Sequence, residues 1–298
     1  MINRAAGQTV TVGSYNVKNM FAKEDIVPGS RTRPKPEFEL EALSRVIKNV
    51  DADVVSLQEL SSAKTLKAFM KDKGLDKIYP HVAHITGNSE RGINVGIISK
   101  YPFEAVVTHK DQEFPLIDGS GDAKFSRDLL RVDVDLDGQP GAELSVYNTH
   151  SKSRLPSEGP GPSSDTQRAS EAREMRRLAE EEMKPFPNRL YVLTGDWNDN
   201  TNDASVQEVL NPKSGEKFVD SLASLPADER NTWPANPNAS HGHDPEQFDH
   251  IVYPESKADQ MLGSEIHRFE ATPDGKYKWL SSAASDHLMI TAKFKVQE

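Results

Sequence analysis

The sequence predicts an α/β fold in which β-sheets are covered by helices. Short apolar runs alternate with stretches of helical periodicity in the first half of the chain, and long loops separate the later strands. Of the 298 residues, 36% are hydrophobic and 28% are charged, which is typical of a water-soluble globular protein with a substantial core. Such a mixture places helices on the outer faces of sheets.

The predicted strands are short apolar runs bounded by turn-forming residues. They are Thr9–Asn16, Asp53–Glu59, Ile93–Ser99, Leu129–Asp135, Leu144–Thr149, Leu190–Thr194, Phe248–Tyr253 and His287–Val296.

The predicted helices are Glu39–Asn49, Ser62–Lys73 and Thr166–Met183. In the third, an apolar face is formed by Ala169, Ala172, Met175 and Leu178. Asp165 is its predicted N-cap. The helix also alternates glutamates with arginines, which predicts a salt-bridged surface at Arg168, Arg173, Arg176 and Arg177.

Long loops rich in proline, glycine, serine and asparagine connect these elements. They are Lys23–Pro36, Asp111–Ser126, Ser153–Ser164, Asn198–Asp203 and Asn231–Gln247. None has the length or composition of an interdomain linker, and long loops between strands usually carry binding or catalysis.

The net charge of −10 disfavours a protein that coats nucleic acid, since such proteins are usually basic. It is compatible with an enzyme whose carboxylates surround a cation. The absence of cysteine excludes disulfides, thiolate catalysis and cysteine zinc sites.

No apolar run approaches the ~20 residues of a membrane-spanning helix, so no membrane insertion is expected. Residues 1–8 lack the regions of a signal peptide. We therefore expect a soluble protein, cytoplasmic by default, although a secreted mature form would look the same.

Six clusters of polar residues stand at the ends or starts of the predicted strands. They are Ser14-Tyr15-Asn16, Ser56-Leu57-Gln58-Glu59, Asn148-Thr149-His150, Thr194-Gly195-Asp196-Trp197-Asn198, Phe248-Asp249-His250 and Ser285-Asp286-His287. Each alone is equally typical of turn residues and helix caps. Because several strand ends can converge on one sheet edge, the set together predicts a site.

The chemistry of the clusters suits hydrolysis of a phosphate ester. Mg²⁺ prefers oxygen ligands and keeps several waters, so Glu59 with Asn16 and Asp286 beside it forms a candidate metal site. A carboxylate such as Asp196 can hold or deprotonate the attacking water.

The remaining polar residues suit the transition state, which carries extra negative charge. Asn198 and a positively charged histidine can stabilise that charge. A carboxylate beside a histidine fixes its tautomer and raises its pKa, and Asp249 with His287 is the candidate pair.

The six clusters, in this order, resemble the endonuclease/exonuclease/phosphatase superfamily, which includes deoxyribonuclease I, exonuclease III, neutral sphingomyelinases and inositol polyphosphate phosphatases. The similarity runs from Tyr15 to His287. It implies a four-layer α/β sandwich of two packed mixed sheets flanked by helices. It also implies one catalytic domain over residues 1–298, with its core at about 9–296.

The resemblance further implies roles for individual residues. Asn16, Glu59 and Asp286 would take metal-site positions. His150, Asp196, Asn198, Asp249 and His287 would take the catalytic positions, with Asp249 orienting His287. Phe125-Ser126-Arg127 is similar to the segment that gives deoxyribonuclease I a phosphate-contacting arginine.

Two departures from deoxyribonuclease I affect what can be carried over. That enzyme has an arginine for the DNA minor groove just after its metal glutamate, whereas Leu60-Ser61-Ser62 follows Glu59 here. It also orients its first histidine with a carboxylate, and the corresponding stretch Tyr79–Ile85 has no acid. The partner of His150 is therefore left open.

Basic residues in two loops are candidates for binding flanking phosphates. Arg31, Arg33 and Lys35 follow the Asn16 strand, and Lys152 and Arg154 follow His150. A solvated loop is the equal alternative. Thr232 is a further candidate for phosphate contact, and Arg91, before a predicted central strand, stays undecided.

The favoured function is a Mg²⁺- or Mn²⁺-dependent phosphodiesterase that hydrolyses DNA or RNA by in-line attack of water. Alternatives are a phosphatase or phospholipase C-type hydrolase of inositol phosphates or sphingomyelin, and a catalytically dead binding module. Nucleic acid is the expected partner, and we expect a monomer with no obligate protein partner.

Overall fold

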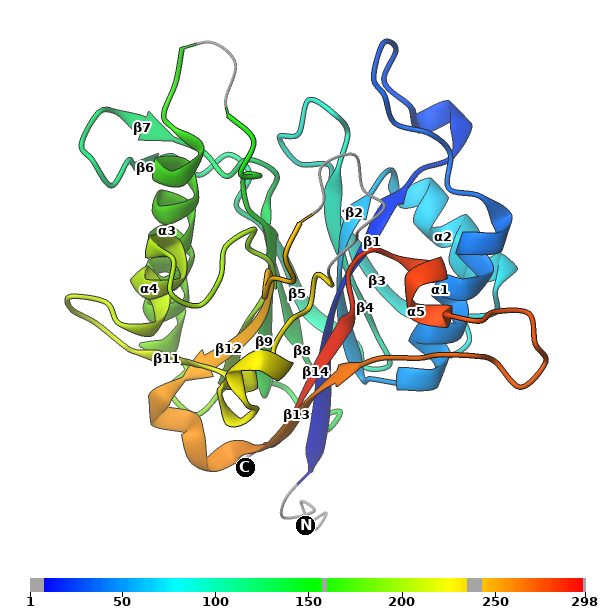
Figure 1. Ribbon diagram of the computed structural model, residues 1–298. Coiled ribbons are helices and arrows are strands. Elements are labelled where there is room, and N and C mark those ends of the chain that lie inside the picture. Colours follow the sequence, from blue (N-terminus) through cyan, green and yellow to red (C-terminus); the bar gives the residue numbers. More distant parts are fainter. Residues whose placement is uncertain (1–7, 157–159, 235–242, 297–298) are drawn as a thin grey trace.

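The computed structural model describes residues 8–156, 160–234 and 243–296, so the predicted loops Ser153–Ser164 and Asn231–Gln247 lie partly outside the described residues. Two six-stranded sheets pack face to face, and helices cover their outer faces (Figure 1). Each sheet contains parallel and antiparallel neighbours. The predicted sandwich of two mixed sheets flanked by helices is confirmed.

The first sheet contains the N-terminal strand and the last strand side by side. Its order is β13 (Met261–His267), β14 (Met289–Lys295), β1 (Thr9–Met20), β2 (Val54–Leu60), β4 (Asn94–Ser99) and β3 (His81–His84). Only β1 and β2 run parallel among these neighbours.

The second sheet is built from the middle of the chain. Its order is β11 (Phe218–Asp220), β12 (Asp249–Pro254), β10 (Leu190–Asp196), β9 (Leu144–His150), β8 (Leu129–Val134) and β5 (Phe103–Thr108). Here β9 and β10 are the parallel pair. A small separate hairpin joins β6 (Phe114–Pro115) to β7 (Asp122–Ala123).

The helices divide between the two outer faces (Figure 1). The first sheet carries α1 (Glu37–Val50), α2 (Ala63–Asp72) and α5 (Leu280–Ala284), and the second carries α3 (Ser164–Met183) and α4 (Ala204–Leu210). Short 3-10 turns occur at Lys23–Asp25, Ser221–Ser224, Ala227–Glu229 and Glu255–Gln260. Within the described ranges, no helix combines the length and the apolar character needed to cross a bilayer.

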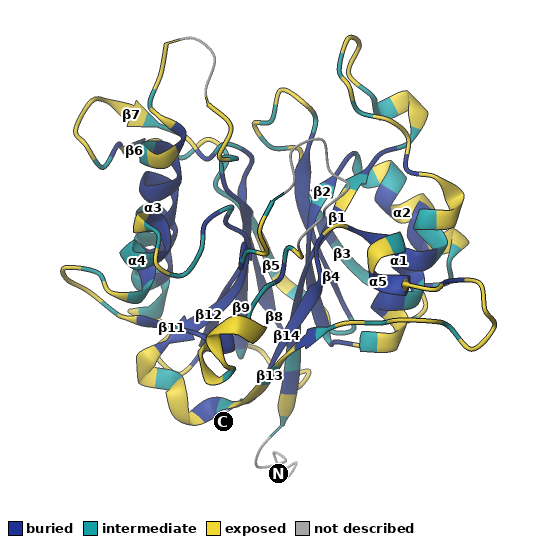
Figure 2. Cartoon of the chain, viewed as in Figure 1, coloured by how far each residue is buried: buried dark blue, intermediate teal, exposed yellow. Residues whose placement is uncertain are grey.

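Three apolar clusters hold the layers together. One fills the space between the sheets, one lies between the first sheet and its helices, and one lies between the second sheet and its helices. Figure 2 shows the result, with buried residues concentrated in the central strands and on the inward faces of the helices.

The third predicted helix needs two corrections. Its N-cap is Ser163, whose hydroxyl accepts from the backbone N–H of Thr166, so the prediction of Asp165 was wrong. The predicted salt-bridged surface is also partly wrong, because Arg168 and Arg176 are buried. Arg168 pairs with the buried carboxylate of Asp199 at 2.7 Å, so this face of the helix lies against the loop that follows β10.

The two sheets also meet through a row of buried polar contacts. The hydroxyls of Thr194 and Ser56 lie 2.7 Å apart. Gln58 Nε2 donates to Asn148 Oδ1 at 2.8 Å, and Asn148 Nδ2 donates to the backbone oxygen of Gly96 at 2.8 Å. Since buried polar groups must be paired, these contacts fix how the sheets are placed relative to each other.

Gly195 allows β9 and β10 to approach closely just before the end of β10. Its φ is +140°, and a Cβ at this position would lie 1.9 Å from the backbone oxygen of Thr149. No side chain fits in that space, and the strand could accommodate one only by moving away from its neighbour.

We therefore predict that Gly195→Ala lowers the free energy of unfolding by roughly 2–4 kcal/mol, because backbone atoms must separate. The matched control is Gly263→Ala in β13, where nothing lies within 4 Å of the added methyl group. Urea unfolding of both variants checks this, and equal small losses would contradict it.

Candidate active site

The six polar clusters converge on one edge of the sandwich. The parallel strands β1, β2, β9 and β10 end there, and the antiparallel strands β12 and β14 begin there. The register sets His150 and Asp249 on either side of Asp196 in the second sheet. Strand direction thus brings together residues that are far apart in the sequence.

The buried carboxylate of Asp196 lies at the centre of this arrangement. Its Oδ2 accepts from Asn16 Nδ2, on the opposite sheet, at 2.8 Å. The same oxygen lies 3.5 Å from His150 Nε2 and 3.7 Å from His287 Nε2. Its Oδ1 accepts from the backbone N–H of Asn198 at 2.9 Å.

Glu59 lies next to this centre and is half-buried. Its Oε1 accepts from Asn16 Nδ2 at 3.1 Å, and its Oε2 accepts from the backbone N–H of Asn19 at 2.8 Å. Glu59 has a φ of +64°, a left-handed conformation that is uncommon outside glycine. Such strain is often found where a side chain must be aimed at a functional site.

Asp249 and His287 are in direct contact, with Oδ2 and Nδ1 2.8 Å apart. Thr232 holds the carboxylate in place, because its hydroxyl donates to the same Asp249 oxygen at 2.7 Å. The Thr232 hydroxyl also accepts from the backbone N–H of Asp249 at 3.0 Å, and the residue is fully buried. The predicted phosphate contact of Thr232 is therefore wrong, and it acts on the position of Asp249 instead.

The two histidines differ in charge because their neighbours differ. Burial alone would lower the pKa of His287, but the negative charges of Asp249 and Asp196 outweigh it and hold that pKa well above its ordinary value. Burial, together with the positive charges of Arg127, His287 and Arg91, holds the pKa of His150 well below its ordinary value. One side of Asp196 therefore faces a cation and the other faces a neutral imidazole.

The two ring nitrogens of His150 have different surroundings. Its Nε2 faces Asp196, whereas its buried Nδ1 has no hydrogen-bond partner among the described residues. The carboxylate that orients the first histidine in deoxyribonuclease I thus has no counterpart in the part of the chain that the structure describes.

A divalent cation fits the acidic side of this centre. Glu59, His150 and Asp196 offer ligand atoms that all lie within 4.8 Å of one another. Burial raises the pKa of Asp196 to about 7, with the charge of His287 acting against this rise and the charge of Asp249 adding to it. Asp249 and His287 also lie close to Asp196, but they bind each other, and a protonated histidine cannot be a metal ligand.

Within the described residues, the side chains of two predicted site residues, Asp286 and Asn198, form no hydrogen bond with Asp196. Asp286 is exposed and belongs to none of the acidic and histidine groups found among the described residues. The side chain of Asn198 donates to the backbone oxygen of Ser151 at 3.1 Å, while its backbone N–H reaches Asp196.

Arg127 is buried beside the centre. Its Nη1 donates to the backbone oxygen of Ser151 at 2.8 Å, and its Nε has no partner within the described ranges. The buried carboxylate of Glu171, from α3, accepts from the backbone N–H groups of Ser126 at 2.6 Å and Lys152 at 3.1 Å. Glu171 thus holds the segments on both sides of the arginine, a role that its position on a helix gave no sign of.

The other basic residues fall into three kinds. Arg31 and Arg33 are exposed, and Lys152 is half-buried, so their phosphate contacts stay predictions. Lys35 is buried and donates to the backbone oxygen of Lys18 at 3.2 Å and to Glu39 at 3.1 Å, which contradicts its place in an exposed basic cluster. The third kind is Arg154, whose charge is taken up by ion pairs.

Arg154 is ion-paired with three carboxylates, which leaves little of its charge for a phosphate. The partners are Asp199 at 3.2 Å, Asp203 at 2.6 Å and Glu246 at 3.4 Å.

Within the cluster Phe248-Asp249-His250, Asp249 contacts His287 at the site, whereas His250 has a structural position. Its ring is fully buried, with Nδ1 3.0 Å from Asp220 Oδ2 and Nε2 2.8 Å from the backbone oxygen of Asp199. It therefore supports the loop after β10 from behind and takes no part in the group around Asp196.

Comparison with known proteins gives one family and one fold. A model of the endonuclease/exonuclease/phosphatase family matches residues 11–233. Among curated proteins, no sequence is similar enough to match.

Three solved structures with the same fold are each less than 20% identical to this chain. TDP2 from D. rerio, crystallised with a single-strand DNA product, is 19% identical over 96% of this chain and 98% of its own, with a TM-score of 0.58. SmcL is 18% identical over 96% of this chain and 99% of its own, with a TM-score of 0.63. Beta toxin from Staphylococcus aureus is 18% identical over 95% and 99%, with a TM-score of 0.62.

We predict that Asp249→Asn lowers the pKa of His287, because the largest of the negative charges that oppose burial is lost while that of Asp196 remains. An NMR titration of the imidazole signals measures this. The matched control is Asp220→Asn, which removes the carboxylate beside His250 and should leave the titration of His287 in place.

The same pair should make stability depend on pH. Because the folded pKa of His287 is raised, its contribution to the free energy of unfolding is complete below about pH 6.5 and is lost as the pH rises through the folded pKa. A pKa for His287 that is unchanged in Asp249→Asn would contradict the pairing.

Proposed function

This chain belongs to the endonuclease/exonuclease/phosphatase family, and on that premise we propose that it is a Mg²⁺- or Mn²⁺-dependent phosphodiesterase that hydrolyses DNA or RNA. We further propose that residues 9–296 act as one catalytic domain.

The observation that carries the proposal is the environment of Asp196. A buried carboxylate lies between a neutral and a charged histidine and is joined through Asn16 to the half-buried Glu59. Hydrolysis of a phosphodiester needs a base for water, a cation against the phosphoryl oxygens and a metal-binding acid. The arrangement offers a residue for each.

In the proposed reaction, Asp196 holds the attacking water and takes its proton, while the hydrogen bond from Asn16 keeps the carboxylate aimed. His287, kept positively charged by Asp249, stabilises the negative charge that develops on the phosphoryl oxygens. The neutral His150, on the other side of Asp196, would donate a hydrogen bond to the phosphoryl group in the transition state. The backbone contact from Asn198 fixes the orientation of the carboxylate.

Arg127 would add a second positive charge to the site. The arginine need not move during the reaction, because its side chain already donates to Ser151 and because Glu171 holds the neighbouring segments.

Glu59 would hold the metal ion on the side that faces Asp196, and we propose as further oxygen ligands Asn16, which contacts both carboxylates, and the exposed Asp286. When bound, Mg²⁺ or Mn²⁺ supplies Lewis-acid stabilisation of the phosphoryl oxygens. The ligand atoms of Glu59, His150 and Asp196, which all lie within 4.8 Å of one another, support a cation on this side of the centre.

Nucleic acid is the proposed substrate because of the cations around the acidic centre. Arg127 is buried at the centre, and Arg31 and Arg91 lie near it with no ion pair among the described residues. The similar TDP2 from D. rerio was crystallised with a single-strand DNA product, which supports the same class of substrate here. A phosphatase or phospholipase C-type activity is the alternative that the experiment below decides.

We predict that the protein cleaves DNA or RNA in Mg²⁺ or Mn²⁺ and that EDTA abolishes the activity, because the candidate ligands need a hard divalent cation. The assay compares plasmid DNA, linear DNA, RNA, inositol phosphates and sphingomyelin, each with and without metal. Turnover of inositol phosphates or sphingomyelin alone would replace the nuclease proposal, and full turnover in excess chelator would end the metal proposal.

Substitutions should separate the proposed roles. We predict that Asp196→Asn and His150→Ala lower kcat by ~10²–10⁴-fold, the usual loss of a base or a transition-state hydrogen bond. Glu59→Gln should instead raise the Mg²⁺ concentration needed for half-maximal rate.

The control is Asp133→Asn, which alters a buried carboxylate paired with Arg131 and Arg189 near the far end of the second sheet. If Asp196→Asn or His150→Ala retains the unaltered rate while folded, the assignment is wrong.

A further inference from the structure

Beside the acidic centre lies a hollow that the proposed reaction does not use. It has a volume of about 380 Å³ and is lined by Asn19, Ser30, Arg31, Thr32 and Arg91. Volumes of ~300–1,000 Å³ are typical of sites for small ligands or ligand groups.

The hollow adjoins Glu59 directly. The backbone N–H of Asn19 donates to Glu59 Oε2 at 2.8 Å, so one wall of the hollow is also the support of the proposed metal ligand. On another wall, Arg91 is close enough to the centre for its charge to add to burial and to Arg127 in lowering the pKa of His150.

The lining is rich in hydrogen-bond donors whose charge is not compensated. Neither Arg31 nor Arg91 forms an ion pair or a hydrogen bond with any described residue. Both side chains are exposed. The hydroxyl of Thr32, which can donate to an anion, likewise has no partner in the described ranges. Two unpaired arginines at one hollow make it locally attractive to an anion, in a chain whose net charge is −10.

The loop that carries Arg31 is held at its base. Lys35 N donates to the backbone oxygen of Phe21 at 3.0 Å, which closes the loop, and Ser61 and Ser62 both donate to Asp25 at 2.8 and 2.9 Å. These two serines follow Glu59 closely in the sequence. The loop is thus fastened to the strand end that provides the proposed metal ligand.

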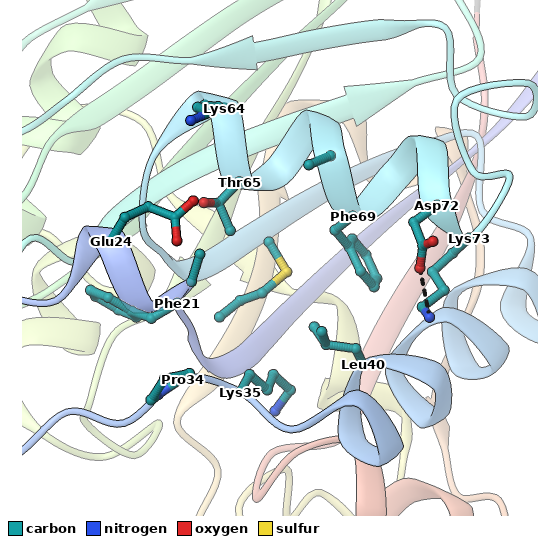
Figure 3. A pocket seen from close by; sticks show the side chains of 13 residues that line it. Phe21, Glu24, Pro34, Lys35, Leu40, Lys64, Thr65, Phe69, Asp72 and Lys73 are labelled. Carbon is teal, nitrogen blue, oxygen red and sulfur yellow. Dashed lines mark ion pairs between the residues drawn. The ribbon is translucent and has the colours of Figure 1, made fainter.

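The other side of the same loop faces α2. Figure 3 shows Phe21, Pro34 and Lys35 on one side of an apolar pocket of about 300 Å³, which Leu40 of α1 and Phe69 of α2 also line. The loop therefore packs against α2 on one side, while Arg31 lines the hollow on the other.

We propose that this hollow is a second anion subsite, in which Arg31 and Arg91 bind a phosphate next to the scissile one on the same substrate chain. The planar guanidinium groups suit phosphate, which they can bind through two hydrogen bonds each. This rests on the proposed phosphodiesterase function and deepens it. It makes the enzyme selective for a substrate with at least two phosphates and explains how an acidic protein binds a polyanion.

Kinetics on small substrates test the selectivity. The substrates are p-nitrophenyl phosphodiesters of thymidine, attached at the 5′ or the 3′ oxygen, each with and without a second phosphate on the other oxygen. We expect a roughly tenfold or greater preference in kcat/KM, mainly through KM, for the second phosphate in one of the two pairs.

The variants identify the residues responsible. Arg31→Ala and Arg91→Ala should each remove most of that preference, and Arg31→Lys should keep only part of it, since lysine lacks the planar fork. Lys23→Ala, which removes an equal charge from the same loop, should keep the preference. A preference that survives in both arginine variants, or that is absent from the unaltered enzyme, overturns the subsite.

A binding measurement separates this proposal from the proposed function. Inorganic phosphate is titrated into the protein in EDTA, and the Nε–Hε NMR signals of the arginines are followed, with Arg31→Lys and Arg91→Lys providing the assignment. We expect both signals to shift with one common midpoint, even if none of the nucleotide esters is hydrolysed. Signals of Arg31 and Arg91 that stay in place, while the protein remains folded, overturn the subsite whatever the enzyme cleaves.

Discussion

The structure depends on one buried charge, the carboxylate of Asp196, which is 1% exposed and lies where the two sheets meet. A buried carboxylate is tolerated only with partners, and the nearest one crosses from the other sheet, where Asn16 donates to it at 2.8 Å. The polar row behind it, from Thr194 and Ser56 to Gln58, keeps the sheets in the position that makes this contact possible. The same buried contacts therefore hold the two sheets together and set the geometry of the site.

The surroundings of Asp196 also give His287 and His150 different charges. His287 contacts Asp249 and is held in its charged form, whereas His150 is buried among positive charges and is held neutral. Asp196 thus has a charged imidazole on one side and a neutral one on the other, and in the proposed reaction the charged ring stabilises the phosphoryl oxygens. Thr232 shows how far this organisation extends, because a residue with no access to solvent fixes the position of the orienting carboxylate.

The sequence predicted the inner strands of both sheets but none of the edge strands β13, β3, β11 and β5. Inner strands are buried on both faces and give continuous apolar runs, whereas edge strands are half exposed and have mixed patterns. The polar clusters were visible because each followed such a run. The hollow at Arg31 and Arg91 was not, since it forms only where two loops distant in sequence meet. Burial of Arg168 was equally invisible, because its partner Asp199 comes from another element.

We propose a cation-dependent phosphodiesterase centre at the edge where the polar ends of both sheets meet. Anomalous X-ray diffraction from crystals soaked in Mn²⁺ locates the ion without any assay. We expect a peak within ligand distance of a Glu59 carboxylate oxygen, on the side that faces Asp196. A peak only at another acidic group, such as Asp135, Asp137 and Glu143, with none at Glu59, would contradict it.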